Sequence, residues 1–154
     1  MWCLRKGVWG YWRMDVWWGW DGLFVYLFFF MVMKSVIKSY RELETWQEAM
    51  NLVENIYEIT KALPSEEMYG LKSQIRRSAV SIPSNIAEGH GRKGIAEYLH
   101  HLSIARGSLA ELETQLILCV RLHYITSENM KPIWVKSQTV GKLLTGLVRS
   151  LAKK

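Results

Sequence analysis

The spacing of apolar residues between positions 41 and 152 most constrains how this chain can fold. These residues recur every three or four positions, as along one face of an α-helix, and no strand-like alternation competes with them. The four stretches run from Leu43 to Leu63, from Met68 to Gly89, from Ile95 to Val120 and from Ile133 to Leu151. Helices of about 20–28 residues joined by short links pack as antiparallel neighbours. The sequence therefore predicts an all-α fold, an antiparallel up-down-up-down four-helix bundle.

The links between the stretches carry helix start and stop signals. Pro64 ends the first stretch, and Ser65 is a plausible N-cap for the second. Thr126 or Ser127 can cap the fourth stretch. Three glycines in the link before the third stretch suit a C-cap and left-handed backbone: Gly89, Gly91 and Gly94.

Pro83 interrupts the second stretch. Proline removes one backbone hydrogen bond and crowds the carbonyl four residues earlier, here that of Ala79, so we expect a kink near Pro83. The alternative is that the helix stops and Ser84 or Asn85 caps a new one. The apolar spacing continues unshifted across the proline, which favours one kinked helix.

Residues 1–33 differ in composition from the rest and hold 12 of the 19 aromatic residues, without any Glu or Ser. Their unbroken apolar run, Leu23–Met33, is short for a membrane span of about 20 residues, and no small-residue cleavage site follows it. We interpret residues 1–32 as an extension outside the folded domain. It is either sequence upstream of a true start at Met33 or Met31, or a disordered apolar segment. The bundle domain would then span residues 33–154.

The net charge of +6 belongs mostly to the bundle, because residues 34–154 hold 17 Lys or Arg against 12 Glu, an excess of five. Such an excess permits an acidic partner such as nucleic acid. Cys3 and Cys119 are too few for a disulfide framework, so we expect a cytoplasmic protein. A membrane location is not expected.

No set of residues predicts catalysis, a metal, a cofactor or a small-molecule substrate. The histidines are His90, His100, His101 and His123, and the adjacent pair points about 100° apart on a helix, so the two cannot share a metal ion. Cys119 falls beside the apolar stripe, which indicates a buried, inert thiol. We therefore expect a protein that is not an enzyme.

Basic residues on the second and third stretches are the candidates for binding nucleic-acid phosphates. The candidates are Lys72, Arg76, Arg77, Arg92, Lys93 and Arg106. The alternative is structural. Arg92 and Lys93 could complement a helix C-terminus, while the other arginines could pair across helices with Glu88, Glu111 or Glu113.

Several apolar residues lie off the main stripes, and a single narrow bundle would not need them. They are Ile59, Ile104, Leu118, Trp134 and Leu143. This excess predicts self-association.

Four segments carry a family resemblance: Tyr40–Gln47, Tyr69–Leu71, Ile75–Gly89 and Leu102–Leu116. Over about residues 38–150 the chain resembles the four-helix bundle proteins encoded in intervening sequences of 23S ribosomal RNA, the S23 ribosomal-protein-like family. The resemblance implies a bacterial, cytoplasmic, non-enzymatic bundle.

Related proteins include the accessory variability determinant of diversity-generating retroelements. They assemble as homopentamers, and the retroelement protein binds nucleic acid and a reverse transcriptase through a basic surface. The matching basic residues here are Arg76, Arg77 and Arg106. The resemblance thus implies a homopentamer that binds RNA or DNA. The alternative is a protein–protein interaction scaffold whose basic residues are structural.

Overall fold

The computed structural model describes residues 39–153. The extension predicted for residues 1–32, with its alternative starts, lies outside the described residues. The described residues form helices and connecting turns only, as predicted. The long helices are α2 (Glu44–Ile59), α3 (Leu71–His90), α4 (Ile95–Arg121) and α5 (Ser127–Ala152). Short 3-10 turns are η1 (Tyr40–Glu42), η2 (Thr60–Ala62) and η3 (Ser65–Met68).

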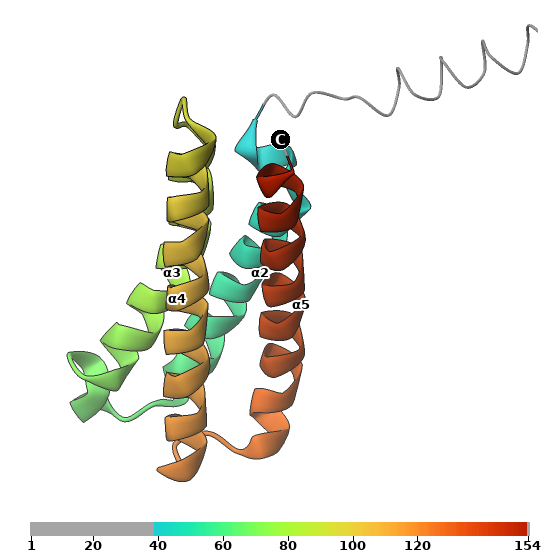
Figure 1. The fold of residues 1–154 in the computed structure, drawn as a ribbon. Helices are drawn as coiled ribbons and strands as arrows, with labels where there is room; N and C mark the ends of the chain where they lie inside the picture. Colours follow the sequence, from blue (N-terminus) through green and yellow to red (C-terminus); the bar gives the residue numbers. More distant parts are fainter. Residues whose placement is uncertain (1–38, 154) are drawn as a thin grey trace, which may run out of the picture. The chain divides into compact units, whose positions relative to one another are not determined.

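The four long helices run alternately up and down, as the colour gradient in Figure 1 shows. The most extensive packing is between α3 and α4. α2 contacts both α3 and α5, and α4 contacts α5, so the helices close into a ring around one core. This arrangement confirms the predicted four-helix bundle.

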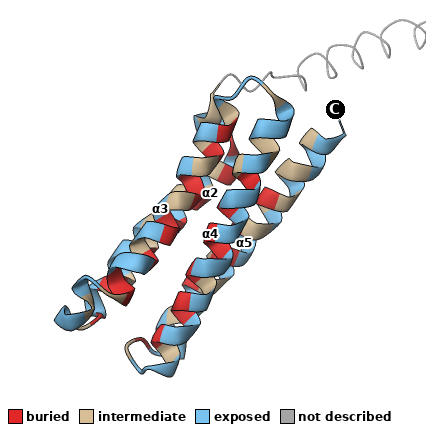
Figure 2. Ribbon diagram, turned by 60° about the vertical axis from the view of Figure 1, so that its left-hand side comes forward, coloured by how far each residue is buried: buried red, intermediate tan, exposed pale blue. Residues whose placement is uncertain are grey.

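Each helix contributes one buried stripe to the core, seen as the red segments that face inward in Figure 2. Burial of a Leu or Ile side chain contributes about 1.5–3 kcal/mol. The largest side chains that are completely buried are leucines and isoleucines from all four helices: Leu52, Ile56, Ile75, Ile82, Ile86, Leu102, Leu112, Leu116 and Leu144. The predicted stripes of α3, α4 and α5 therefore contain the core faces. In α2 the 3-4 spacing predicts a stripe of Trp46, Met50, Val53 and Tyr57, which are half-buried or exposed, whereas the buried face is Thr45, Ala49, Leu52 and Ile56.

The start of α3 differs from the prediction. Ser65 opens the short turn η3 and does not cap α3, which begins at Leu71. The Glu67 carboxylate instead accepts a hydrogen bond from the Leu71 backbone N–H at 2.8 Å, and its other oxygen accepts one from the Tyr124 hydroxyl at 3.2 Å. At the start of α5, the predicted cap at Thr126 is confirmed, because its Oγ1 accepts from the Asn129 N–H at 3.3 Å.

Of the link glycines, Gly91 is the C-cap of α3, as predicted, but the left-handed backbone does not occur, since no glycine among the described residues has a positive φ. Gly89 lies inside α3. A Cβ added there would lie 2.6 Å from Cδ2 of Tyr98 and 2.9 Å from Cβ of His101. Gly89 therefore lets α3 and α4 approach closely, which does not require left-handed backbone.

α3 continues through Pro83 as one helix, as predicted. Ser84 Oγ donates to the Val80 carbonyl at 2.8 Å, and Asn85 Nδ2 donates to the Ser81 carbonyl at 2.8 Å. Because both side chains bond back into the preceding turn, neither caps a new helix. The bend at Pro83 stays a prediction.

Candidate nucleic-acid interface

The six predicted basic residues fall in three places on the bundle. Lys72, Arg76 and Arg77 line a hollow between α2 and α3. Arg92 and Lys93 lie at the link between α3 and α4, and Arg106 lies in a groove between α4 and α5.

Arg76 is fixed by contacts with the end of α2. Its Nε donates to Thr60 Oγ1 at 2.9 Å, and its guanidinium carbon lies 4.6 Å from the centre of the Tyr57 ring. Such a cation–π contact contributes about 0.5–2 kcal/mol. On the same helix Lys72 is buried and Arg77 is exposed. Arg76 therefore joins α2 to α3 while it lines the hollow.

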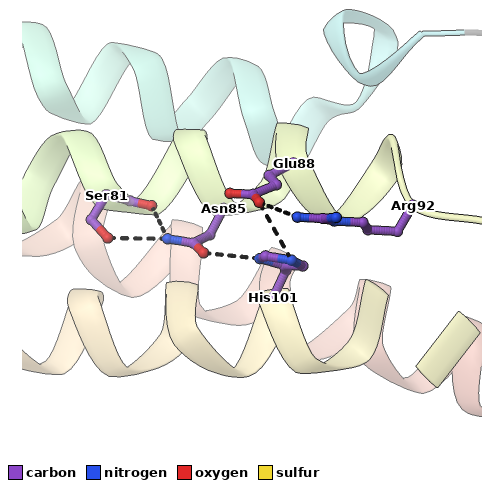
Figure 3. Close-up of polar contacts among 5 residues, drawn as sticks. All are labelled: Ser81, Asn85, Glu88, Arg92 and His101. Atoms are coloured by element: carbon purple, nitrogen blue, oxygen red, sulfur yellow. Dashed lines mark hydrogen bonds and ion pairs between the residues drawn. The ribbon is translucent and has the colours of Figure 1, made fainter. Parts of the chain in front are cut away.

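Arg92 belongs to a polar network that joins α3 to α4 (Figure 3). It forms an ion pair with Glu88, one helical turn earlier. His101 on α4 lies between two α3 side chains: its Nδ1 is 3.2 Å from Asn85 Oδ1, and its Nε2 is 3.8 Å from Glu88 Oε1. Lys93, next in the chain, is exposed. Arg92 is therefore partly neutralised, and Lys93 is the freer cation of the two.

Arg106 lies in an open groove of about 570 Å³ between α4 and α5. Two further cations from α5, Lys142 and Arg149, line the same groove, and sequence reasoning missed both. They are seven residues apart, a spacing that places them on one helix face and could have indicated their association. The groove therefore gathers three cations around one hollow, as many as the hollow between α2 and α3.

One carboxylate, that of Glu113, lines the groove, and it accepts a hydrogen bond from a neutral side chain. Gln138 Nε2 donates to Glu113 Oε1 at 2.9 Å. None of the three groove cations is within ion-pair distance of a carboxylate among the described residues. Small side chains and glycines separate the cations: Ala110, Gly141, Thr145 and Gly146. A polyanion could therefore approach the helix backbones closely and contact all three cations.

The alternative pairing of arginines across helices does not form. In the described part of the chain Arg76, Arg77 and Arg106 have no carboxylate partner. Glu111 accepts instead from Gln115 Nε2 at 2.9 Å, within α4. Among the described residues, Arg76 and Arg92 therefore contact other parts of the bundle without forming cross-helix carboxylate pairs, and Arg106 has no polar partner.

Within residues 39–153 no three His, Cys, Asp or Glu side chains group closely enough to hold a metal ion. Cys119 is completely buried, as predicted. Burial raises the pKa of its thiol to about 11, and the negative charge of Glu67 adds to the shift. No helix in the described range has the length and apolar character needed to cross a membrane.

Comparison with known proteins places these features in a family context. Residues 41–146 match the protein family described as 23S rRNA-intervening sequence protein. A crystal structure of a protein of unknown function from the S23 ribosomal protein family of Bacteroides thetaiotaomicron VPI-5482 is similar, with a TM-score of 0.63 and 30% sequence identity. The similarity covers 68% of this chain and 97% of that one. No curated protein matches the chain.

Proposed function

Because the chain belongs to the 23S rRNA-intervening sequence protein family, we propose that it is a non-enzymatic, self-associating bundle that binds structured nucleic acid. RNA is the first candidate, since the family is named after intervening sequences of 23S rRNA. The proposed location is the bacterial cytoplasm, in keeping with the lone buried cysteine of the described helices.

The observation that carries the proposal is the α4–α5 groove. Arg106, Lys142 and Arg149 converge there without a carboxylate partner. Unpaired cations that line a hollow attract phosphates and release the counterions around them. This provides affinity for the nucleic-acid backbone that does not depend on the base sequence. Aromatic side chains that could stack on bases do not line the groove. We therefore expect recognition of backbone shape and charge.

Self-association is supported by apolar side chains that remain exposed on the bundle. Ile104 and Leu118 of α4 are exposed, as expected, and Ile117 and Val135 join them. Ile59, Trp134 and Leu143 are half-buried, so they contribute less to this surface. For the proposed homopentamer, light scattering should give a mass about five times the 18.0 kDa of one chain. A monomer in solution would contradict it.

Charge reversal in the groove tests nucleic-acid binding. We expect Arg106→Glu/Arg149→Glu to weaken binding of a 20-base-pair RNA duplex at least tenfold, because two charge-assisted contacts of about 1.5–3 kcal/mol each become repulsive. Fluorescence anisotropy with a labelled duplex measures the change in Kd.

The matched control is Arg121→Glu/Lys131→Glu, which changes the net charge equally on the same two helices, at exposed positions outside the groove. It should bind within about threefold of the original chain. Equal losses in both variants would mean that overall charge, and not the groove, determines binding.

A protein-interaction scaffold is the second candidate function. It is favoured by the contacts of Arg76 with Thr60 and of Arg92 with Glu88, which give two of the six candidate cations structural roles. A partner protein that stays bound to the tagged chain after nuclease treatment would support the scaffold. Loss of all bound proteins on nuclease treatment would support nucleic-acid binding.

A further inference from the structure

Among the described residues, Lys72 combines a packed aliphatic stem with an ammonium that has no partner. Only 9% of the residue is exposed, yet its ammonium forms no hydrogen bond or ion pair with any other described residue. Its nitrogen is not one of the fully enclosed, unpartnered polar atoms of the described residues, so the aliphatic stem is packed while the charge reaches solvent. The three N–H donors of the ammonium can all bind an acceptor. The position therefore suits an anion that comes from outside the chain.

The side chain of Lys72 lines the hollow between α2 and α3, whose volume is about 390 Å³. The residues around it include two more cations and a hydroxyl, and none of the lining residues is acidic. They are Tyr57, Met68, Lys72, Ser73, Arg76, Arg77 and Val80. This local charge of +3 contrasts with the α4–α5 groove, where Glu113 is among the lining residues.

Contacts with α2 hold the Arg76 side chain in one position at this hollow. Thr60, which accepts from Arg76 Nε, is itself completely buried, and its hydroxyl donates to the Tyr57 carbonyl at 3.1 Å. The cation–π contact with the Tyr57 ring further restrains the guanidinium. A guanidinium has five N–H donors, and the contacts with Thr60 and Tyr57 leave donors free. An arginine fixed in this way loses little conformational entropy when it binds an oxyanion.

We propose that the α2–α3 hollow is a binding pocket for a phosphate monoester. Lys72, Arg76 and Arg77 would neutralise its two negative charges, and the Ser73 hydroxyl would supply a further donor. The pocket stands on the burial of Lys72 and the cations around it. Only the assignment of the phosphate to the end of a nucleic-acid strand rests on the proposed function.

Inorganic phosphate is the probe for the pocket itself. The full chain is compared with Lys72→Met, which keeps the apolar stem and removes the charge, and with the control Lys131→Met at an exposed position of α5. We expect phosphate to raise the melting temperature of the original chain and of the control at constant ionic strength. Its Kd should be at least tenfold weaker for Lys72→Met, because one charge-assisted contact is lost.

Without phosphate, Lys72→Met should melt at the same temperature as the original chain or higher, because methionine keeps the packing of the stem and the lost ammonium has no partner among the described residues. Equal responses of all three proteins to phosphate, or no response in the original chain, would overturn the pocket. A Lys72→Met variant that is destabilised without phosphate would also overturn it, since Lys72 would then have a structural role.

The source of the phosphate is tested with one RNA strand carrying either a 5′-phosphate or a 5′-hydroxyl. Tighter binding of the phosphorylated strand by the original chain, and not by Lys72→Met, would assign the pocket to a nucleic-acid end. Equal binding of the two strands, with a retained response to inorganic phosphate, would assign it to a small phosphate compound. RNA binding that fails altogether while phosphate still binds would overturn the proposed function and leave the pocket.

Discussion

The thiol of Cys119 is completely buried on α4, and this burial changes its pKa. The thiol is neutral at physiological pH in the folded and the unfolded chain. Burial, aided by the charge of Glu67, raises its pKa in the folded protein to about 11. The unfolded thiol therefore loses its proton at a lower pH than the folded one. The protonated thiol therefore adds to the free energy of unfolding. This contribution is complete below the pKa of the unfolded thiol and is lost as the pH rises through about 11.

This difference predicts a loss of stability at alkaline pH that depends on one residue. Between about pH 9 and pH 11 the free energy of unfolding should fall by up to about 1.4 kcal/mol per pH unit because of Cys119. Cys119→Ala should lack this part of the slope, although it is less stable at neutral pH because of the space it leaves. Urea unfolding at several pH values measures both slopes. Parallel slopes would show that the thiol does not contribute.

Single residues also show what sequence can indicate. Cys119 could be predicted as buried because it falls beside the apolar stripe of its helix. The burial of Lys72 could not, because a lysine four residues before Arg76 has the pattern of an exposed face. Its burial depends on how the end of α2 packs over the start of α3.

Among the elements, α4 ends in a hydrogen-bond pattern that usually contains glycine. The Tyr124 N–H donates to the Cys119 carbonyl at 3.0 Å, and the His123 N–H donates to the Val120 carbonyl at 3.1 Å, which together form a Schellman motif. His123 is at the left-handed position with φ 58°, and it is the one non-glycine residue of the described range with positive φ. A side chain there costs about 1–2 kcal/mol.

We therefore expect His123→Gly to raise the free energy of unfolding by about 1 kcal/mol, after the entropy cost of glycine in the unfolded chain is subtracted. The control is His100→Gly, the same substitution inside α4, where the backbone is helical. It should lower stability by about 0.3–0.5 kcal/mol, the difference in helix propensity between histidine and glycine. Urea unfolding measures both. If both variants are destabilised, the left-handed position carries no strain.

The number and order of the helices could be predicted because each buried stripe is continuous in the sequence. The start of α3 could not be predicted. Ser65 carries the local signal of a cap, but Glu67 caps α3 and is in turn held by Tyr124, 57 residues away in the chain. The role of Gly89 was missed for a similar reason. Its contact with Tyr98 depends on the distance between two helices.

Across the whole bundle, charge is separated between helices. α2 contains four Glu and no Lys or Arg, whereas α5 contains four Lys or Arg and one Glu. A bound polyanion should therefore lie along the side that includes α5. Sequence reasoning found Arg106 and not Lys142 or Arg149, because which faces of α4 and α5 meet is a property of the packed bundle.

The salt dependence of duplex RNA binding tests nucleic-acid recognition through this groove most directly. The logarithm of the binding constant, plotted against the logarithm of the salt concentration, should have a slope of about −2.7 or steeper if all three groove cations contact phosphates. Arg106→Gln/Arg149→Gln should make the slope shallower by about 1.8. Binding that does not respond to salt, a slope unchanged by the two substitutions, or no binding at low salt would contradict nucleic-acid recognition by this groove.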